Sequence, residues 1–417
     1  MGDPSPEDWN RVRHYASWMR QIYVEGWLLL EEETLNKIQF NSPPGGWFPA
    51  LQLLSWYITE SNLPWANLFF CPHLKRIFIY TAWSWDFINI IPPAILSTLT
   101  SIISTLPTSS LQLMSVDDGQ ATLGWPYFKG SFSSFILRCE PSFTAYNSPV
   151  PLSDAALDHL IHLPHLHTWR VHGPPPTYPT SSLPLVFPPI RELTLGDGAA
   201  CGWLLLLRRL EGGASTTQGV TPLSKAKESL KFLNLEDTSD INIDPSFVST
   251  IQCFRNLVRL NADDYYHHEY YNGQCNFKLN NDHVTELAMA LTQLESLLLG
   301  YPCSENTCLT TVACLLPISV HCGKLEELMI HFNTTKIVDD LRNISEDPLF
   351  QQLRSLPRRL PMSLDVHRMP LKLHESDFET VAKGMVDIFP SLTSCKGLER
   401  GWDEISGKIK DLQEHSG

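Results

Sequence analysis

The chain has 417 residues, of which 18% are charged and 43% hydrophobic, and this composition excludes a chain that self-repulsion keeps unfolded. Acidic residues outnumber basic ones 45 to 31, which gives a net charge of −14. A protein that binds nucleic acid by neutralising phosphates needs the opposite sign, so we expect no nucleic-acid partner.

Residues 1–46 predict an N-terminal helical cap. A helix from Glu7 to Leu30 would place its large apolar side chains on one face, namely Trp9, Val12, Tyr15, Trp18, Met19 and Ile22. The first residues are acidic where a secretory signal has a basic start and an apolar run. We therefore expect a protein of the cytoplasm or the nucleus. Cysteines within apolar runs are then expected to be buried free thiols, as at Cys71, Cys139, Cys253, Cys314 and Cys322.

Residues 47–372 carry an irregular repeat. An apolar residue is followed after three positions by a leucine-like anchor, and further apolar residues lie three and five positions after the anchor. Complete copies have anchors at Leu51, Leu74, Leu166, Ile190, Leu257, Leu294 and Leu325, and partial copies include Leu111, Leu230 and the pair Leu364 and Val366. The long interval between Leu111 and Leu166 predicts one degenerate copy around Phe132, Phe135 and Leu137.

The spacing of the repeat indicates how each copy folds. Its last two apolar positions are two residues apart, as on one face of a strand, and the anchor would fill the corner before that strand. The segments between strands predict helices at 154–163, 245–254, 282–291 and 307–316. Good N-caps precede three of them: Ser153 or Asp154, Asp244, and Asn281 or Asp282.

One repeat cannot be stable alone. Ordering its roughly thirty residues costs ~1 to 2 kcal/mol per residue in conformational entropy. Burial of its few apolar side chains contributes only roughly 1.5 to 3 kcal/mol per side chain. Stacking must supply the rest. The predicted fold class is therefore α/β: an irregular leucine-rich-repeat solenoid with a curved parallel sheet and outer helices. Residues 373–417, including a helix over 374–388, would form the C-terminal helical cap and tail.

The segment from Phe87 to Val116 contains no charged residue and is long enough to span a membrane. It also contains prolines and many hydroxyl side chains, while apolar residues recur at helical spacing: Ile91, Ile95, Leu99, Ile102 and Leu106. This pattern favours an amphipathic helix covering a core, and we expect no membrane association.

The segment Trp9-Asn10-Arg11-Val12-Arg13-His14-Tyr15-Ala16, followed by residues 18–22, resembles the region just after the F-box in basidiomycete fungal F-box proteins. Two later runs, residues 166–171 and 325–328, are similar to the leucine-rich repeats of those proteins. The resemblance implies a substrate-recognition subunit of a cullin-RING ubiquitin ligase. In such a protein the F-box binds a Skp-type adaptor and the solenoid holds the protein to be ubiquitylated.

The F-box itself usually opens with Leu-Pro-x-Glu, and this chain departs from that pattern. Its Leu-Pro pairs have other residues at the glutamate position: Ala66, Ser109, Leu166, Val186, Ser319, Arg359 and Ser363. Three explanations are open: a truncated gene model, loss of the F-box, or an N-terminal helix that is a remnant of it. The Skp-type adaptor is therefore a partner only if an F-box precedes this chain. The alternative function is a free-standing leucine-rich-repeat binding module or a decayed paralogue without a ligase role.

No pattern of catalytic or metal-binding residues is complete. Five histidines gather at His159, His162, His165, His167 and His172, but Pro164 separates a predicted helix from a predicted strand within this group. The segment from Gly401 to Lys408 has the wrong glycine spacing for a phosphate loop and Ile409 where Ser or Thr is needed. We therefore expect no enzyme activity, no cofactor and no metal.

The remaining hypothesis is protein recognition. Strand residues that alternate with the buried ones would form a concave face, and two loops that follow strands are unusually aromatic. These loops either bind a partner or cover their own repeats. The predicted partner-binding residues on the concave face or rim are Phe78, Tyr80, Trp83, Trp85, Arg170, His172, Asn234, Glu236, Asn261, Asp263, Tyr265, Tyr266 and His331.

Overall fold

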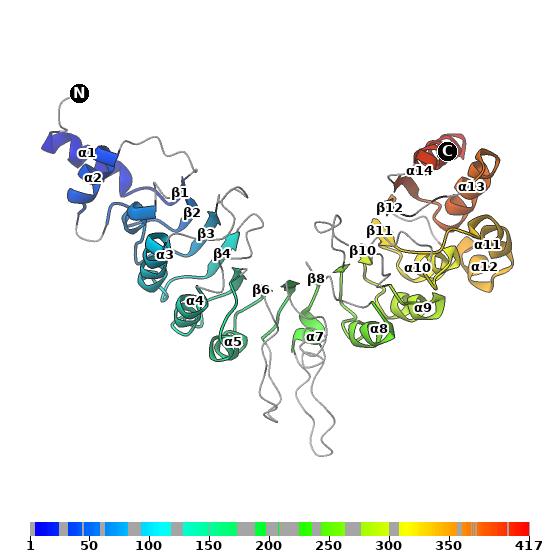
Figure 1. Ribbon diagram of the computed structural model, residues 1–417, viewed down its shortest axis with the longest axis horizontal. Helices are drawn as coiled ribbons and strands as arrows, with labels where there is room; N and C mark the ends of the chain where they lie inside the picture. Colours follow the sequence, from blue (N-terminus) through cyan, green and yellow to red (C-terminus); the bar gives the residue numbers. More distant parts are fainter. Residues whose placement is uncertain are drawn as a thin grey trace, which may run out of the picture. The chain divides into compact units, whose positions relative to one another are not determined.

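The computed structural model describes most of the chain (Figure 1). The described residues are 5–24, 32–43, 46–58, 63–81, 93–117, 128–148, 150–172, 188–196, 207, 225–235, 243–262, 277–299, 308–356, 361–367, 369, 371, 373–397 and 400–416. The chain forms two compact units. Unit 1 contains Met1–Ser182 and Val186–Ile190, and unit 2 contains Leu183–Leu185 and Arg191–Gly417.

Unit 1 is an open parallel sheet with helices along one side (Figure 1). Its strands are β1 (Gln21–Val24), β2 (Leu53–Ile58), β3 (Arg76–Thr81), β4 (Leu113–Asp117), β5 (Ala145–Ser148) and β6 (Thr168–His172). Its helices are α1 (Pro6–Ala16), α2 (Glu32–Phe40), the 3-10 helix η1 (Leu63–Leu68), α3 (Pro93–Thr105), α4 (Lys129–Ile136) and α5 (Asp154–Ile161). Within this unit each strand pairs in parallel with the next strand in the chain, from β1 to β6.

Unit 2 repeats the same arrangement. Its strands are β7 (Glu192–Gly196), β8 (Phe232–Leu235), β9 (Arg259–Ala262), β10 (Ser296–Leu299), β11 (Glu327–Ile330), β12 (Met362–His367) and β13 (Leu392–Gly397). Its α-helices are α7 (Lys225–Ser229), α8 (Pro245–Ile251), α9 (Asn281–Ala290), α10 (Leu315–His321), α11 (Ile337–Asn343), α12 (Pro348–Arg354), α13 (Phe378–Ile388) and α14 (Arg400–Ser416). Short 3-10 helices are η4 (Val312–Cys314), η5 (Ile344–Glu346) and η6 (Glu375–Asp377).

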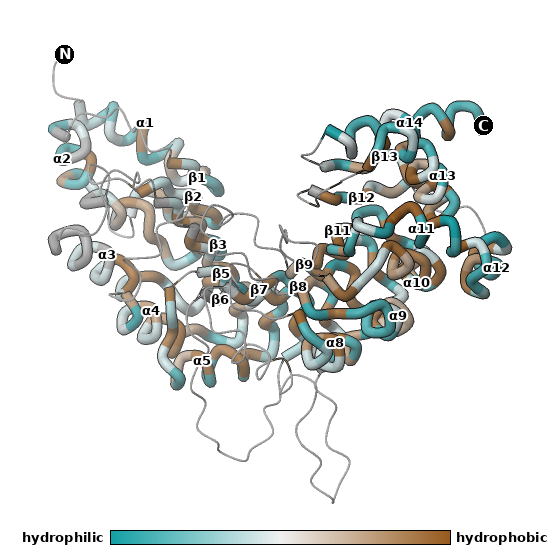
Figure 2. The backbone as a smooth tube through the Cα atoms, turned by 45° about the vertical axis from the view of Figure 1, so that its right-hand side comes forward, coloured by the Kyte–Doolittle hydropathy of each residue, from teal (hydrophilic) through white to brown (hydrophobic). Residues whose placement is uncertain are grey.

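The core consists of side chains that the strand register places in rows. In unit 1, Leu54, Ile77, Met114, Tyr146 and Trp169 follow one another across paired strands, and all are buried. In unit 2 the corresponding row is Leu193, Leu233, Leu260, Leu297, Leu328 and Leu364. Figure 2 shows hydrophobic residues recurring along the strands and along helices such as α5 and α10.

Each anchor lies three residues before the core-row residue of its own repeat. All nine, from Leu51 to Leu325, are buried, and most have no exposed surface at all. The predicted fold class, an α/β leucine-rich-repeat solenoid with a parallel sheet and outer helices, is therefore confirmed in each unit.

Two sequence predictions placed elements wrongly. The N-terminal helix ends at Ala16, and Ile22 lies in strand β1 instead of on the helix face. The degenerate copy between Leu111 and Leu166 is not at Phe132, which lies on helix α4. That copy is strand β5, with Phe143 as its buried anchor and Tyr146 and Ser148 in the core rows. The core positions of β5 hold a tyrosine and a serine, whereas the repeat pattern has apolar residues there, so the pattern did not predict this strand.

Two of the four predicted helix starts are confirmed, and the other two are shifted. The Ser153 side chain accepts a hydrogen bond from the Ala156 N–H and begins α5, and Asp244 begins α8. Helix α9 is capped by Asn280, one residue before the predicted caps. The helix expected over 307–316 begins later, because Thr311 caps η4, and it continues as α10 to His321.

Asp244 also links stability to pH. Its Oδ1 accepts hydrogen bonds from the N–H groups of Ser246 and Phe247 at 2.8 and 3.1 Å. Burial raises the pKa of this carboxyl, but the hydrogen bonds from Ser246 and Phe247 outweigh burial and hold the pKa below its ordinary value. Because the folded pKa is depressed, the stabilisation is present above the ordinary carboxyl pKa and is lost as pH falls through the folded value.

We expect Asp244→Ala to lower the free energy of unfolding by about 1 kcal/mol near neutral pH, since the N-cap is lost. Urea unfolding at a series of pH values measures this difference, which should shrink in acid. Ser249→Ala, on the exposed side of the same helix, is the control. A penalty for Asp244→Ala that does not change with pH would contradict the role of its charge.

We expect Leu260→Ala to cost about 2 to 5 kcal/mol, because it opens a cavity in a row whose members touch on both sides. The midpoint of urea or thermal unfolding measures it. Leu309→Ala removes the same group from an exposed position in unit 2 and should leave the midpoint nearly unchanged. Equal effects of the two substitutions would contradict the stacked-row core.

Candidate functional site

The candidate site is the face of each sheet opposite the core rows. Successive side chains of a strand point to opposite faces, so residues between the core rows point away from the helices. In unit 1 the register places six such residues in one row: Tyr23, Ser55, Phe78, Ser115, Asn147 and Arg170. Two residues further along, Tyr57 and Tyr80 form a second row.

Four aromatic residues gather on strands β1 to β3. We call Tyr23, Tyr57, Phe78 and Tyr80 the aromatic surface. The exposed fractions of Tyr23, Tyr57 and Tyr80 are 65%, 38% and 36%, and Phe78 is half-buried. Tyr57 and Tyr80 are direct partners across β2 and β3, so their Cα atoms lie about 4.8 Å apart, the spacing of neighbouring strands. Large, partly exposed aromatic side chains of this kind serve as anchors in protein interfaces.

Sequence reasoning found half of the aromatic surface. Phe78 and Tyr80 were predicted and lie on it, whereas Tyr23 and Tyr57 were missed. Tyr57 directly follows the buried Trp56, and the same alternation that gave Tyr80 would have found it. Tyr23 could not be found in this way, because its strand was taken for part of a helix.

Beyond the aromatic surface the first row becomes polar. The Asn147 amide donates a hydrogen bond to the Ser115 hydroxyl at 3.1 Å. Among the described residues, no donor reaches the buried Asn147 Oδ1. Arg170, a predicted site residue, is next to Asn147 on β6 and is half-buried. This end of the face therefore offers hydrogen-bonding groups in place of aromatic rings.

In unit 2 the corresponding row changes character along the sheet. Asn234 and Asn261 are paired neighbours on β8 and β9 and are both half-buried. Thr194 and Met329 in the same row are buried. His331 is only 4% exposed, and its ring centroid lies 6.5 Å from that of Phe277. In this conformation the His331 side chain is part of the interior and does not offer a contact surface.

The other predicted site residues lie outside what the structure describes. They are Trp83, Trp85, Glu236, Asp263, Tyr265 and Tyr266. His172 belongs to strand β6, but its side chain is not among those described. These positions remain predictions.

The histidine-rich segment does not form a cluster among the described side chains. Ring nitrogens of His159 and His162 hydrogen-bond to the carbonyls of Cys139 and Asp158, at 3.1 and 2.6 Å. His167 Nδ1 lies 3.2 Å from the Thr168 hydroxyl. Within the described part of the chain, no three His, Cys, Asp or Glu side chains are placed to hold a metal ion.

The thiols differ in burial. Burial raises the pKa of Cys139 to about 12 and also raises the pKa of Cys314 and Cys395. Cys308 and Cys322 are buried as well. Cys253 was expected to be buried, but it is half-exposed, because it lies in the turn after α8 instead of on the helix face that packs inward.

Comparison with known proteins assigns this chain to no family. No family model matches the chain, and its sequence matches no curated protein. None of the helices in the described ranges has the length and hydrophobicity needed to cross a membrane.

We expect Cys253 to react with iodoacetamide at pH 8 well before Cys139, Cys314 and Cys395, because the thiolate is the reacting form and burial disfavours it at those three sites. Mass spectrometry of peptides after timed exposure compares the four sites directly. Modification of Cys139 as fast as Cys253 would contradict the described packing.

Proposed function

We propose that this protein is a non-catalytic binding module that holds a protein partner on the strand face of its solenoid. The observation that carries the proposal is the aromatic surface on β1, β2 and β3, with three tyrosines more than one third exposed. Isolated exposed apolar side chains are ordinary, whereas a set in register on adjacent strands favours an interface.

The physical advantage of this surface is its fixed backbone. The parallel ladder already holds β1 to β3 in register, so binding orders few side chains and loses little conformational entropy. Tyrosine offers apolar area together with a hydroxyl, and the hydroxyl of Tyr23 donates to Gln21 Oε1 at 3.3 Å. The partner should therefore present an apolar segment with hydrogen-bonding groups close by.

The net charge of −14 further favours a basic partner, because opposite charge accelerates encounter. Polar groups next to the aromatic surface, such as Ser115 and Asn147, would supply part of the rim.

We further propose that the bound protein is a substrate and that the chain acts as a receptor of a cullin-RING ubiquitin ligase. Support for this role is the resemblance of residues 9–22 to the region after the F-box. In the same region Tyr15 and Trp18 are 63% and 64% exposed, which leaves apolar area for a neighbouring domain. The alternative, a free-standing binding module, uses the same strand face without an adaptor.

The double substitution Tyr57→Ala and Tyr80→Ala is expected to weaken partner binding at least thirty-fold, since a single interface anchor contributes about 2 kcal/mol or more, which is about thirty-fold in Kd. Affinity purification with quantitative mass spectrometry identifies proteins enriched on the wild-type chain, and titration with the purified partner then gives Kd.

Met289→Ala, at an exposed position on α9, is the matched control and should leave Kd unchanged. Thermal unfolding of all variants must stay close to wild type. Undiminished affinity in the double variant would refute the strand face of β2 and β3 as the binding surface.

Mixing the purified chain with a Skp-type adaptor separates the two roles. Stable co-elution supports the receptor role. Failure to associate, with partner binding retained, leaves the free-standing module as the function.

A further inference from the structure

Unit 2 carries a concentration of positive charge where strands β7 to β9 begin. We call Arg191, Lys227, Lys231, Arg255 and Arg259 the basic edge. The ladder brings its members together: the Lys231 N–H donates to the Arg191 carbonyl at 2.8 Å, and the Arg259 N–H donates to the Lys231 carbonyl at 3.0 Å. In the next two repeats the same edge is acidic, with Glu295, Glu326 and Glu327.

The described residues provide these cations with no ion-pair partner. The Arg259 guanidinium instead lies over the Phe232 ring, 5.7 Å from its centroid. Five cations within three repeats, none of them ion-paired with a described residue, outnumber the two carboxylates beside them, Glu192 and Glu228, and this local excess of positive charge attracts anions.

A hollow of about 650 Å³ opens beside two of these cations. It lies between the end of α7, the turn after α8 and the end of α9, all in unit 2, and its lining residues are Lys227, Glu228, Gln252, Cys253, Arg255, Asn256 and Ala290. Its volume lies within the range of small-molecule sites, roughly 300 to 1,000 Å³.

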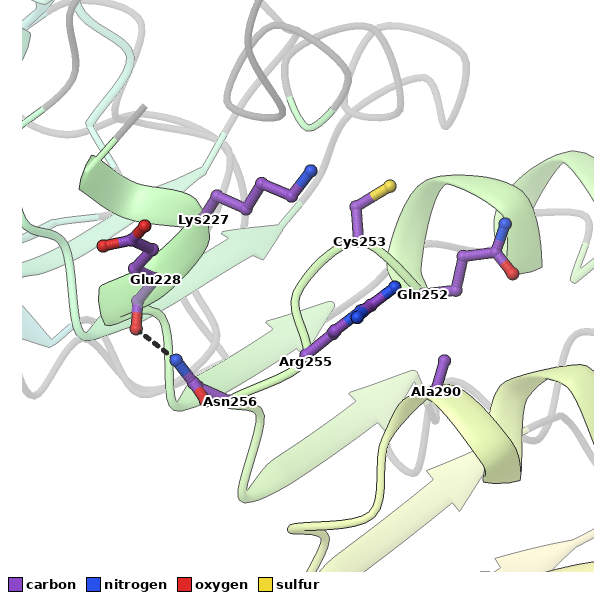
Figure 3. A pocket seen from close by; sticks show the side chains of 7 residues that line it. All are labelled: Lys227, Glu228, Gln252, Cys253, Arg255, Asn256 and Ala290. Atoms are coloured by element: carbon purple, nitrogen blue, oxygen red, sulfur yellow. Dashed lines mark hydrogen bonds between the residues drawn. The ribbon is translucent and has the colours of Figure 1, made fainter. Parts of the chain in front are cut away.

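Two cationic side chains, those of Lys227 and Arg255, and one carboxylate, that of Glu228, line this pocket. Figure 3 shows the Lys227 side chain extending from α7 toward the turn that carries Cys253 and Arg255, while the carboxylate of Glu228 points the opposite way. The Asn256 amide donates to the Glu228 carbonyl at 2.7 Å and so ties α7 to this turn. The amide of Gln252 adds a further neutral hydrogen-bonding group.

We propose that this pocket binds a phosphate monoester. An arginine fork matches two oxygens of a phosphate, and a lysine adds a compact charge on the other side. The phosphate would lie between Arg255 and Lys227, and the esterified group would extend toward Gln252 and Ala290. The proposal concerns a site of unit 2 and does not depend on the aromatic surface of unit 1.

The test is isothermal titration calorimetry of the full chain with O-phosphoserine and with glucose 6-phosphate. Serine and glucose are the matched probes without phosphate. We expect saturable binding of at least one ester and of neither unphosphorylated probe. Binding of O-phosphoserine alone would point to a phosphorylated protein as the source, and binding of the sugar phosphate to a soluble metabolite; either result supports the site.

Arg255→Gln and Lys227→Gln should each weaken that binding about ten-fold or more, since a charge-assisted hydrogen bond is worth about 1.5 to 3 kcal/mol. Lys324→Gln, at an exposed lysine on the acidic part of the same edge, is the control and should bind as wild type. The Tyr57→Ala and Tyr80→Ala variant should also bind normally.

Modification of Cys253 gives a second readout. A phosphate ester in the pocket should slow its reaction with iodoacetamide, and this protection should disappear in Arg255→Gln. Cations near helix C-termini also stabilise those ends. The proposal is overturned if neither ester binds at millimolar concentration, or if the Gln variants lower the unfolding temperature while binding the esters as tightly as wild type.

Discussion

The in-register pairing of parallel strands is the constraint on which the rest of this molecule depends. Because Leu260 pairs with Leu233 on one side and Leu297 on the other, each core side chain is covered by its counterparts in adjacent repeats. Between each pair of adjacent repeats, the hydrogen bonds of the ladder and the burial of the row therefore form together. The same register aligns the opposite face, so the positions of Tyr57 and Tyr80 follow from the packing of Trp56 and Ile79.

The repeat pattern predicted the fold because leucine-like anchors have a strict geometric role. They fill the corner before each strand, where only an apolar side chain of suitable size fits, so the spacing survives in sequence. Strand β5 was missed because its core positions hold Tyr146 and Ser148, which lack the expected hydrophobic signature. A serine is tolerated there because the Ser148 hydroxyl accepts a hydrogen bond from the Val150 N–H. Strand β1 was missed because four residues are too few to distinguish a strand from the end of a helix.

The candidate site was predictable in outline and not in detail. Alternation along a strand tells which residues leave the core, and it gave Phe78, Tyr80, Arg170, Asn234 and Asn261. Alternation does not tell whether a side chain on the face opposite the core is exposed to solvent, as the buried His331 demonstrates. The basic edge was invisible to sequence reasoning for another reason. Its cations come from three separate segments, at Arg191, at residues 227–231 and at residues 255–259, and only the stacking of repeats brings these segments together.

The order of strands in each sheet follows their order in the chain, and this has an evolutionary consequence. A strand that meets only its predecessor and its successor makes every repeat an exchangeable module. If a complete repeat were removed or duplicated, the core side chains of the repeats on either side would still pack against equivalent side chains. Such a chain could lengthen or shorten its strand face by one strand at a time.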